Sequence, residues 1–282
     1  MEELNTVELN MEELNSVELN TEELNTVELN TVELNMERLI SHVKQKDLCY
    51  TSYGVHMYST HWYCCNKNKI CITFTPRGGC SISFQQFLDI NDLLHDGLEY
   101  NLFIHYYRGE IIDKIILHRD INQLIEEKYT FIKFIMNPYI RAVSIYRAQT
   151  SHNLSFREYL KHLVNNTIEF LNDNDKFHLC PQYIDGEENI ITKYIKIDKN
   201  ETYNVTLFDG TLYMLDVNKY TSIHHGQKNV NNTTFSGDIP LNIINGNLPK
   251  TYKYFYDDEI KTLVETYYKT DIEHYAYSFD EF

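Results

Sequence analysis

The sequence lacks several patterns that define common classes of protein. It contains no Walker A motif, G-x-x-x-x-G-K-[ST], and this absence disfavours an ATPase or a kinase. Its six cysteines form no C-x-x-C pair and show no spacing typical of zinc ligands, so reduced thiols in a reducing compartment are expected. No secretory leader and no membrane-spanning apolar run is visible, which predicts a cytoplasmic protein without a membrane anchor.

Residues 1–35 have no lysine and no arginine. They form seven pentads that each end in Glu-Leu-Asn, and their ten glutamates account for most of the net charge of −16. A period of five spreads leucines around a helix and sends them to alternating faces of a strand, so neither element gains one apolar face. We therefore expect a disordered or weakly helical acidic arm. A pentapeptide-repeat β-helix is the alternative, although the position two before the central leucine is Glu or Val instead of a small residue.

The remainder has the pattern of one α/β domain. A chain of 282 residues with 43% hydrophobic content can bury one sizeable core. Strand-like and helix-like segments alternate, which predicts a three-layer, P-loop-like fold with a central parallel sheet flanked by helices. Residues 36–67 are expected to be a connector with a short helix, and residues 68–282 to form the domain. Ser155-Phe156-Arg157-Glu158 is a capping box that predicts a helix start.

The segment from Ile70 to Phe84 is a candidate anion site. Ile70, Ile72 and Phe74 alternate with smaller residues as in a strand, and a helical pattern begins at Ser81. Glycines between a strand and a helix N-terminus allow backbone N–H groups to surround an anion, although plain strand-to-helix connections also contain them. The candidate binding residues are Pro76, Arg77, Gly78, Gly79, Cys80, Ser81 and Ile82.

A matching segment runs from Phe131 to Arg147. Residues 131–136 are almost entirely apolar, as in a strand buried on both faces of a parallel sheet. Asn137 and Pro138 suit the N-cap and first position of the next helix. Arg141 and Ser144 lie three residues apart, so on a helix they are neighbours that could grip one anion together.

Together these segments resemble the sulfotransferases that use 3′-phosphoadenosine-5′-phosphosulfate, specifically the carbohydrate-type branch. Pro76 to Ser81 is similar to that family's P-K-x-G-S/C-T/S loop, and Met136 to Tyr146 to its R-D/N-P-x-x-R-x-x-S-x-Y segment. His178-Leu179-Cys180-Pro181-Gln182 is similar to its H-W-x-P-Q, and the stretch from Tyr254 to Tyr277 looks like its closing helix. The resemblance covers about residues 68–280, with the motifs in the family's order.

The resemblance implies roles for individual residues. Ser81 would bind the 5′-phosphate, and Arg141 with Ser144 the 3′-phosphate of the co-substrate. Arg77 stands where the family has a lysine, and it would stabilise charge on the leaving phosphate with a planar fork instead of a point donor. Met136 replaces the family's first 3′-phosphate arginine and cannot donate a hydrogen bond. We expect another cation to take its place, from Lys133 or Lys228, or cofactor affinity to be reduced.

Sulfonate transfer to a hydroxyl also needs a base. His118 is the favoured candidate, because it follows the apolar run 111–117, a candidate strand, and precedes a capping-box-like helix start at Asp120. That position resembles the place where carbohydrate sulfotransferases keep their catalytic histidine. His105, at the end of a candidate strand over residues 102–105, is the runner-up.

The expected activity is transfer of a sulfonate to a hydroxyl-bearing acceptor, most simply a glycan, without a metal ion and without a nucleic-acid partner. Outside residues 1–35 the net charge is still negative, which disfavours a strongly anionic glycan. Two alternatives stay open: a sulfotransferase-fold binding protein that has lost catalysis, motivated by Met136, and a nucleotide-dependent phosphotransferase. The sequence does not indicate an oligomeric state.

Overall fold

The computed structural model describes residues 36–53, 60–199, 201–207, 209–220, 233–244, 249 and 251–281. The acidic arm over residues 1–35 and the candidate cofactor residue Lys228 lie outside the described residues. In the described part of the chain, no helix is long and apolar enough to cross a lipid bilayer.

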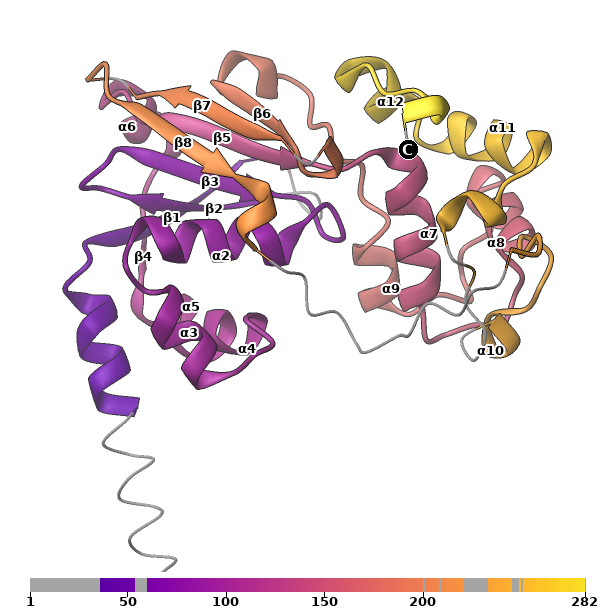
Figure 1. Cartoon of the computed structure of the whole chain (residues 1–282), viewed down its shortest axis with the longest axis horizontal. Coiled ribbons are helices and arrows are strands. Elements are labelled where there is room, and N and C mark those ends of the chain that lie inside the picture. The colour runs from indigo at the N-terminus through magenta and orange to yellow at the C-terminus, as the bar shows by residue number, and fades with distance from the viewer. Residues whose placement is uncertain are drawn as a thin grey trace, which may run out of the picture.

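The centre of the molecule is a six-stranded sheet in the order β4-β1-β2-β3-β5-β6 (Figure 1). Only β2 runs against the others, because it pairs antiparallel with both β1 and β3 while the remaining neighbours pair in parallel. The strands are β1 (Leu48–Tyr53), β2 (Thr60–Cys65), β3 (Ile70–Phe74), β4 (Leu117–His118), β5 (Thr130–Ile135) and β6 (Lys193–Lys196). The predicted α/β class with a mostly parallel central sheet is confirmed.

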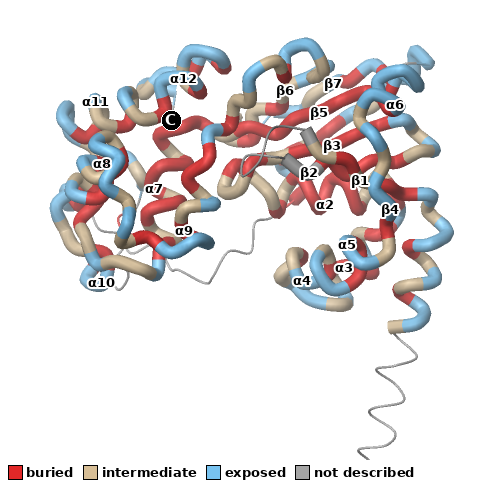
Figure 2. The backbone as a smooth tube through the Cα atoms, turned by 180° about the vertical axis from the view of Figure 1, so that it is seen from behind, coloured by how far each residue is buried: buried red, intermediate tan, exposed pale blue. Residues whose placement is uncertain are grey.

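Helices cover both faces of this sheet. On one face, Ile70 and Ile72 of β3 pack with Phe84 and Phe87 of α2. On the other face, Phe131 of β5 packs with residues of α6, and Ile135 with α12. Successive side chains of a strand point to opposite faces of the sheet, so each strand contributes to the cores on both faces. Every residue of β5 is buried (Figure 2).

A helical part lies beyond the sheet edge at which β3 and β5 end, and it contains α7 to α12 (Figure 1). The helices are α2 (Cys80–Ile90), α3 (Leu94–Tyr100), α4 (His105–Tyr107), α5 (Asp113–Ile115), α6 (Ile121–Glu126), α7 (Pro138–Ala148), α8 (Phe156–Val164), α9 (Asp173–Phe177), α10 (Leu241–Ile244), α11 (Asp258–Tyr267) and α12 (Lys269–Tyr275). A two-stranded ribbon, β7 (Thr202–Thr206) with β8 (Leu212–Asp216), completes the described elements. The predicted capping box at Ser155 is present in full and starts α8.

Residues 102–117 do not form the two strands that their apolar content predicts. They form α4, a π-helical turn over Arg108–Ile112 and α5, and only Leu117–His118 joins the sheet. The buried residues Ile104, Tyr107, Ile111 and Ile112 recur at helical spacing and enter the core beneath β3. The apolar residues of this segment therefore belong to the buried face of helical turns. The consecutive isoleucines hide that helical spacing in the sequence.

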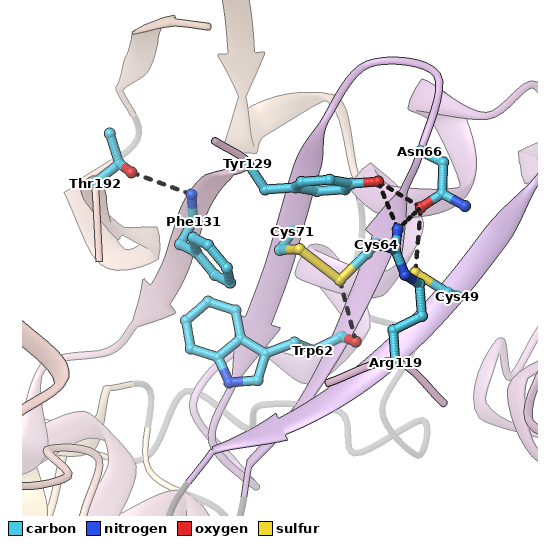
Figure 3. The surroundings of a disulfide bond; sticks show 9 residues. All are labelled: Cys49, Trp62, Cys64, Asn66, Cys71, Arg119, Tyr129, Phe131 and Thr192. Atoms are coloured by element: carbon cyan, nitrogen blue, oxygen red, sulfur yellow. Dashed lines mark hydrogen bonds between the residues drawn. A yellow bond between two sulfur atoms is a disulfide. The ribbon is translucent and has the colours of Figure 1, made fainter. Parts of the chain in front are cut away.

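Residues 36–67 are part of the fold and not a connector. A helix over residues 36–44 packs Leu39 and Val43 into the main core, and β1 and β2 make up two of the six strands. The single tryptophan, Trp62, is fully buried on β2 and stacks edge-on against Phe131 (Figure 3). The α/β unit thus begins at the first described residue.

Cys64 and Cys71 form a disulfide between β2 and β3 (Figure 3). The expectation that all cysteines are reduced is wrong for this pair, whereas Cys49, Cys65, Cys80 and Cys180 are free. The two bonded residues are direct partners in the antiparallel register, so their side chains leave the sheet on the same face. Sequence spacing cannot reveal such a pair, because register is a tertiary property.

Candidate functional site

The candidate site lies where β3 and β5 end. These strands are parallel neighbours, with Phe74 opposite Phe134. The loop after β3 and the start of α7 after β5 therefore emerge side by side from the same edge of the sheet (Figure 1). Ligands of open α/β sheets bind at this carboxyl edge.

The loop has the geometry of an anion cradle. Thr75 accepts a hydrogen bond from the backbone N–H of Gly78 at 2.8 Å, which closes a tight turn. Gly79 is the N-cap of α2 with a φ of 92°, and a Cβ atom there would lie 2.2 Å from Cδ1 of Ile197. Only glycine fits this position. The first N–H groups of α2, which have no acceptor within the helix, are thereby presented at the loop together with the positive end of the helix dipole.

His105 is the histidine that the structure brings to the loop. Its Nε2 atom lies 2.9 Å from Oγ of Ser81 and 3.4 Å from Sγ of Cys80. The ring of Phe103 packs edge-on against the imidazole at 5.0 Å. Tyr106, which is exposed, packs edge-on against Phe103. A histidine, two loop residues and an apolar rim thus meet at the N-terminus of α2.

His118, the base that the sequence favours, is remote from the loop. It does end a strand and precede a helix, as expected, but that strand is β4 at the outer edge of the sheet. Two strands separate β4 from β3, a distance of roughly 14 Å at the usual strand spacing. The His118 side chain is exposed and packs against Tyr50. Strand order, which the sequence does not state, decides between the two histidines.

Arg141 holds the loop in place from inside the protein. Its guanidinium is fully buried and donates hydrogen bonds to the carbonyl oxygens of Pro76, His178 and Cys180, at 2.6 to 3.2 Å. It also lies 3.8 Å from the buried carboxylate of Asp271. The expected grip of Arg141 and Ser144 on one anion is not formed, because Arg141 points into the protein while Ser144 is half-buried at the surface of α7.

Gln182 ties the same region together. Its side-chain amide accepts a hydrogen bond from the backbone N–H of Met136 and donates one to the Met136 carbonyl oxygen. Its own backbone N–H donates to both carboxylate oxygens of Asp271. Gln182 Oε1 would also lie 3.0 Å from a Cβ atom on Gly78. The motif residue Gln182 therefore fixes the spacing between the loop and the start of α7.

Lys133 does not replace the missing arginine at Met136. It is fully buried on β5, where its ammonium contacts the carboxylate of Glu187 and the carbonyl oxygen of Gln182. Burial lowers the pKa of Lys133, and Glu187 opposes that shift. Its ion pair lies on the sheet face covered by α12, because Tyr275 of that helix donates to the same Glu187.

Arg147 is a cation of the site that the sequence reasoning did not single out. It lies on α7 three residues after Ser144, with its guanidinium 5.3 Å from the ring centre of Tyr252 and 2.9 Å from the tyrosine oxygen. Arg77, half-buried in the loop with a φ of 59°, is close enough for the two charges to interact. Burial lowers the pKa of Arg77. The three-residue spacing between Ser144 and Arg147 was the sequence signal that could have identified Arg147.

The described ranges contain no group of three or more His, Cys, Asp or Glu side chains placed to hold a metal ion. The groups that the structure brings to this site are one imidazole, two arginines, a serine and backbone N–H groups. Comparison of the chain with protein-family models, curated proteins and solved structures finds no match.

Proposed function

We propose that the protein is a sulfotransferase that moves a sulfonate group from 3′-phosphoadenosine-5′-phosphosulfate to a hydroxyl group, most simply on a carbohydrate. The observation that carries the proposal is the adjacency of the two resembling segments. The loop Pro76–Ser81 and the start of α7 leave neighbouring parallel strands, and Gln182, from the third resembling segment, bridges them. Three stretches that match in sequence order thus also meet in space.

In the proposed reaction the acceptor oxygen attacks the sulfur atom. A new S–O bond forms while the bond between sulfur and the bridging oxygen of the 5′-phosphate breaks. The acceptor proton passes to Nε2 of His105, and the products are a sulfate ester and adenosine 3′,5′-bisphosphate. Proton transfer to a positioned imidazole contributes typically about 10²–10⁴-fold to a rate. His105 is chosen because it is within hydrogen-bond reach of Ser81.

The loop supplies the charge stabilisation that this step needs. Electrons accumulate on the leaving phosphate, and the first N–H groups of α2 together with the Arg77 guanidinium would stabilise them, as an oxyanion site does. Ser81 would hold the 5′-phosphate. The rings of Phe103 and the exposed Tyr106, next to His105, give the acceptor an apolar surface, which suits the face of a sugar ring.

A binding protein that has lost catalysis is the second candidate, and one observation favours it. Met136 offers no donor where the family has an arginine, and Arg141 is committed to backbone carbonyl oxygens. A nucleotide-dependent phosphotransferase has no loop lysine to support it. A cytoplasmic location belongs to the same proposal. The Cys64–Cys71 disulfide argues against that location, because disulfides are rare in the cytoplasm.

The deciding experiment is titration of the full chain with adenosine 3′,5′-bisphosphate, followed by transfer assays with labelled donor and a panel of sugar and phenolic acceptors. A ligand at about one hundred times its Kd stabilises the folded state by about 2.7 kcal/mol, which a thermal-shift measurement detects. Stabilisation together with label transfer supports the enzyme. Stabilisation without transfer to any acceptor favours the binding protein, and no stabilisation at millimolar nucleotide overturns the proposal.

A further inference from the structure

Two arginines at the site form no ion pair with a carboxylate in the described part of the chain. Neither Arg77 nor Arg147 has an Asp or Glu oxygen within 4.0 Å among the residues that the structure describes, and the Nε atom of each is buried without a hydrogen-bond partner there. Asp175 is near Arg77 but lies beyond that distance. The Asp175 carboxylate already accepts hydrogen bonds from the backbone of Thr150 and Ser151.

The undescribed internal segments cannot supply the missing partner. Residues 54–59, 221–232 and 245–248 contain no Asp and no Glu. In a chain with 41 acidic and 25 basic residues, two interacting cations without an acidic partner among the described residues are unexpected. Partial burial makes them costly, because a desolvated charge needs a counter-charge. A bound anion would remove that cost.

The position of Arg147 on α7 points to where the anion lies. Ile140, Ser144 and Arg147 form the half-exposed face of this helix, while Tyr139, Ala142, Val143 and Tyr146 are buried on the opposite face. Residues three apart on a helix are neighbours, so Ser144 and Arg147 can bind one group. Met136 lies two residues before the first residue of the same helix.

We propose that Arg147, with Ser144, binds the 3′-phosphate of the nucleotide and so takes over the role of the arginine that Met136 replaces, while Arg77 faces the 5′-phosphate. This inference rests on the proposed function. Arginine suits the task, because its planar fork can donate two parallel hydrogen bonds to a phosphate. Tyr252 holds the Arg147 guanidinium in place through its ring and its hydroxyl. The other nearby cations, Arg141 and Lys133, are buried in structural contacts.

The test compares two nucleotides that differ only in the 3′-phosphate: adenosine 3′,5′-bisphosphate and adenosine 5′-phosphate. We expect the wild-type protein to prefer the bisphosphate, and Arg147→Gln to weaken bisphosphate binding by about 10- to 100-fold, the range for a lost charged hydrogen-bond pair. Binding of adenosine 5′-phosphate should change less than about 2-fold. Arg147→Lys should retain part of the preference.

Two variants separate ligand binding from structure. Tyr252→Phe removes the hydroxyl contact of Arg147 but leaves its charge, so the nucleotide preference should persist. Arg38→Gln removes the same charge from the helix over residues 36–44, at the opposite end of the molecule from α7 (Figure 1), and should have no effect.

The outcomes are distinct from those of the functional proposal. If the wild-type protein binds both nucleotides equally, or if Arg147→Gln weakens both to the same extent, this inference is overturned while the sulfotransferase proposal stands. If neither nucleotide binds, both are overturned. The assignment of Arg147 to the 3′-phosphate is supported if Arg147→Gln loses the preference for the bisphosphate while Tyr252→Phe and Arg38→Gln keep it.

Discussion

Arg141 of α7 donates two hydrogen bonds to the carbonyl oxygen of Pro76, from Nε at 3.2 Å and from Nη2 at 3.1 Å. One buried side chain thus joins the helix after β5 to the loop after β3. The two halves of the candidate site are held at a fixed separation before any ligand arrives. Pre-organisation of this kind reduces the cost of binding.

Replacing Arg141 is therefore expected to cost stability first. Arg141→Leu leaves Asp271 buried beside an apolar side chain and removes the donors of three carbonyl oxygens, so the free energy of unfolding should fall by about 3–5 kcal/mol. Urea unfolding measures this, with the half-exposed Arg38→Gln as control, for which we expect a change within about 0.5 kcal/mol. An Arg141→Leu protein of normal stability that had only lost nucleotide binding would instead make Arg141 a ligand residue.

Gly79 is expected to tolerate no side chain. Its positive φ costs an alanine about 1–2 kcal/mol, and the new Cβ atom would collide with Ile197 at 2.2 Å. Gly210 separates the two effects, because it has a φ of 85° but open space around it. Gly79→Ala should therefore destabilise the protein by more than Gly210→Ala, by at least about 1 kcal/mol.

Adding Ile197→Val to the Gly79→Ala protein should restore part of the lost free energy of unfolding, because valine lacks the Cδ1 atom that the new Cβ atom meets. Equal free energies of unfolding for Gly79→Ala and Gly210→Ala would show that Ile197 does not restrict the loop. Chemical denaturation of the wild-type protein and of these three variants provides the measurement.

The two histidines should differ sharply in transfer assays. We expect His105→Gln to lower kcat by about 10²–10⁴-fold, because it removes the base beside Ser81. His118→Gln, at the exposed outer edge of the sheet, should leave kcat within about 2-fold. The reverse pattern, with His105→Gln fully active, would remove His105 from the mechanism. Nucleotide binding by both variants controls for folding.

Thiol counting tests the disulfide. Denaturing alkylation without reductant should find four free thiols, and six after reduction. The closed loop is short, with a separation of seven residues, so reduction should lower the free energy of unfolding by about 2–3 kcal/mol. In the native state Cys49 should react slowly at pH 8, because burial raises the pKa of its thiol to about 11.

Two cysteine variants test whether the effect of reductant on stability comes from this disulfide. Cys71→Ala should abolish the dependence of stability on reductant, whereas Cys80→Ala, which removes a free cysteine, should retain it. Six thiols in the protein as isolated would mean that Cys64 and Cys71 remain reduced, as the sequence alone predicts.

Local signals predicted the elements that carry the site. The alternation before Pro76 gave β3, and the glycines after it gave the turn into α2. The apolar run before Asn137 gave β5, and Asn137 with Pro138 gave the start of α7. Each of these depends on neighbours in the chain, since strand periods, caps and turns are formed by adjacent residues.

Other predictions failed where the deciding contact is distant. Residues 102–105 and 111–117 were expected to be strands, but most of them form helical turns whose apolar side chains pack into the core beneath β3. His118 was expected at the loop, and the order of strands places it at the other side of the sheet. Local patterns contain no information about which strands become neighbours.

The sequence by itself determined that a glycine loop and a capped helix follow two buried strands, and that residues 1–35 account for ten of the sixteen units of net negative charge. The tertiary structure decided which side chains can act there. Arg141 and Arg147 lie on the same helix and are both basic, yet packing buries the guanidinium of Arg141 against carbonyl oxygens. The guanidinium of Arg147 instead contacts Tyr252 and has no acidic partner among the described residues. Burial, strand order and register depend on residues far apart in the chain, and only the folded core brings those residues together.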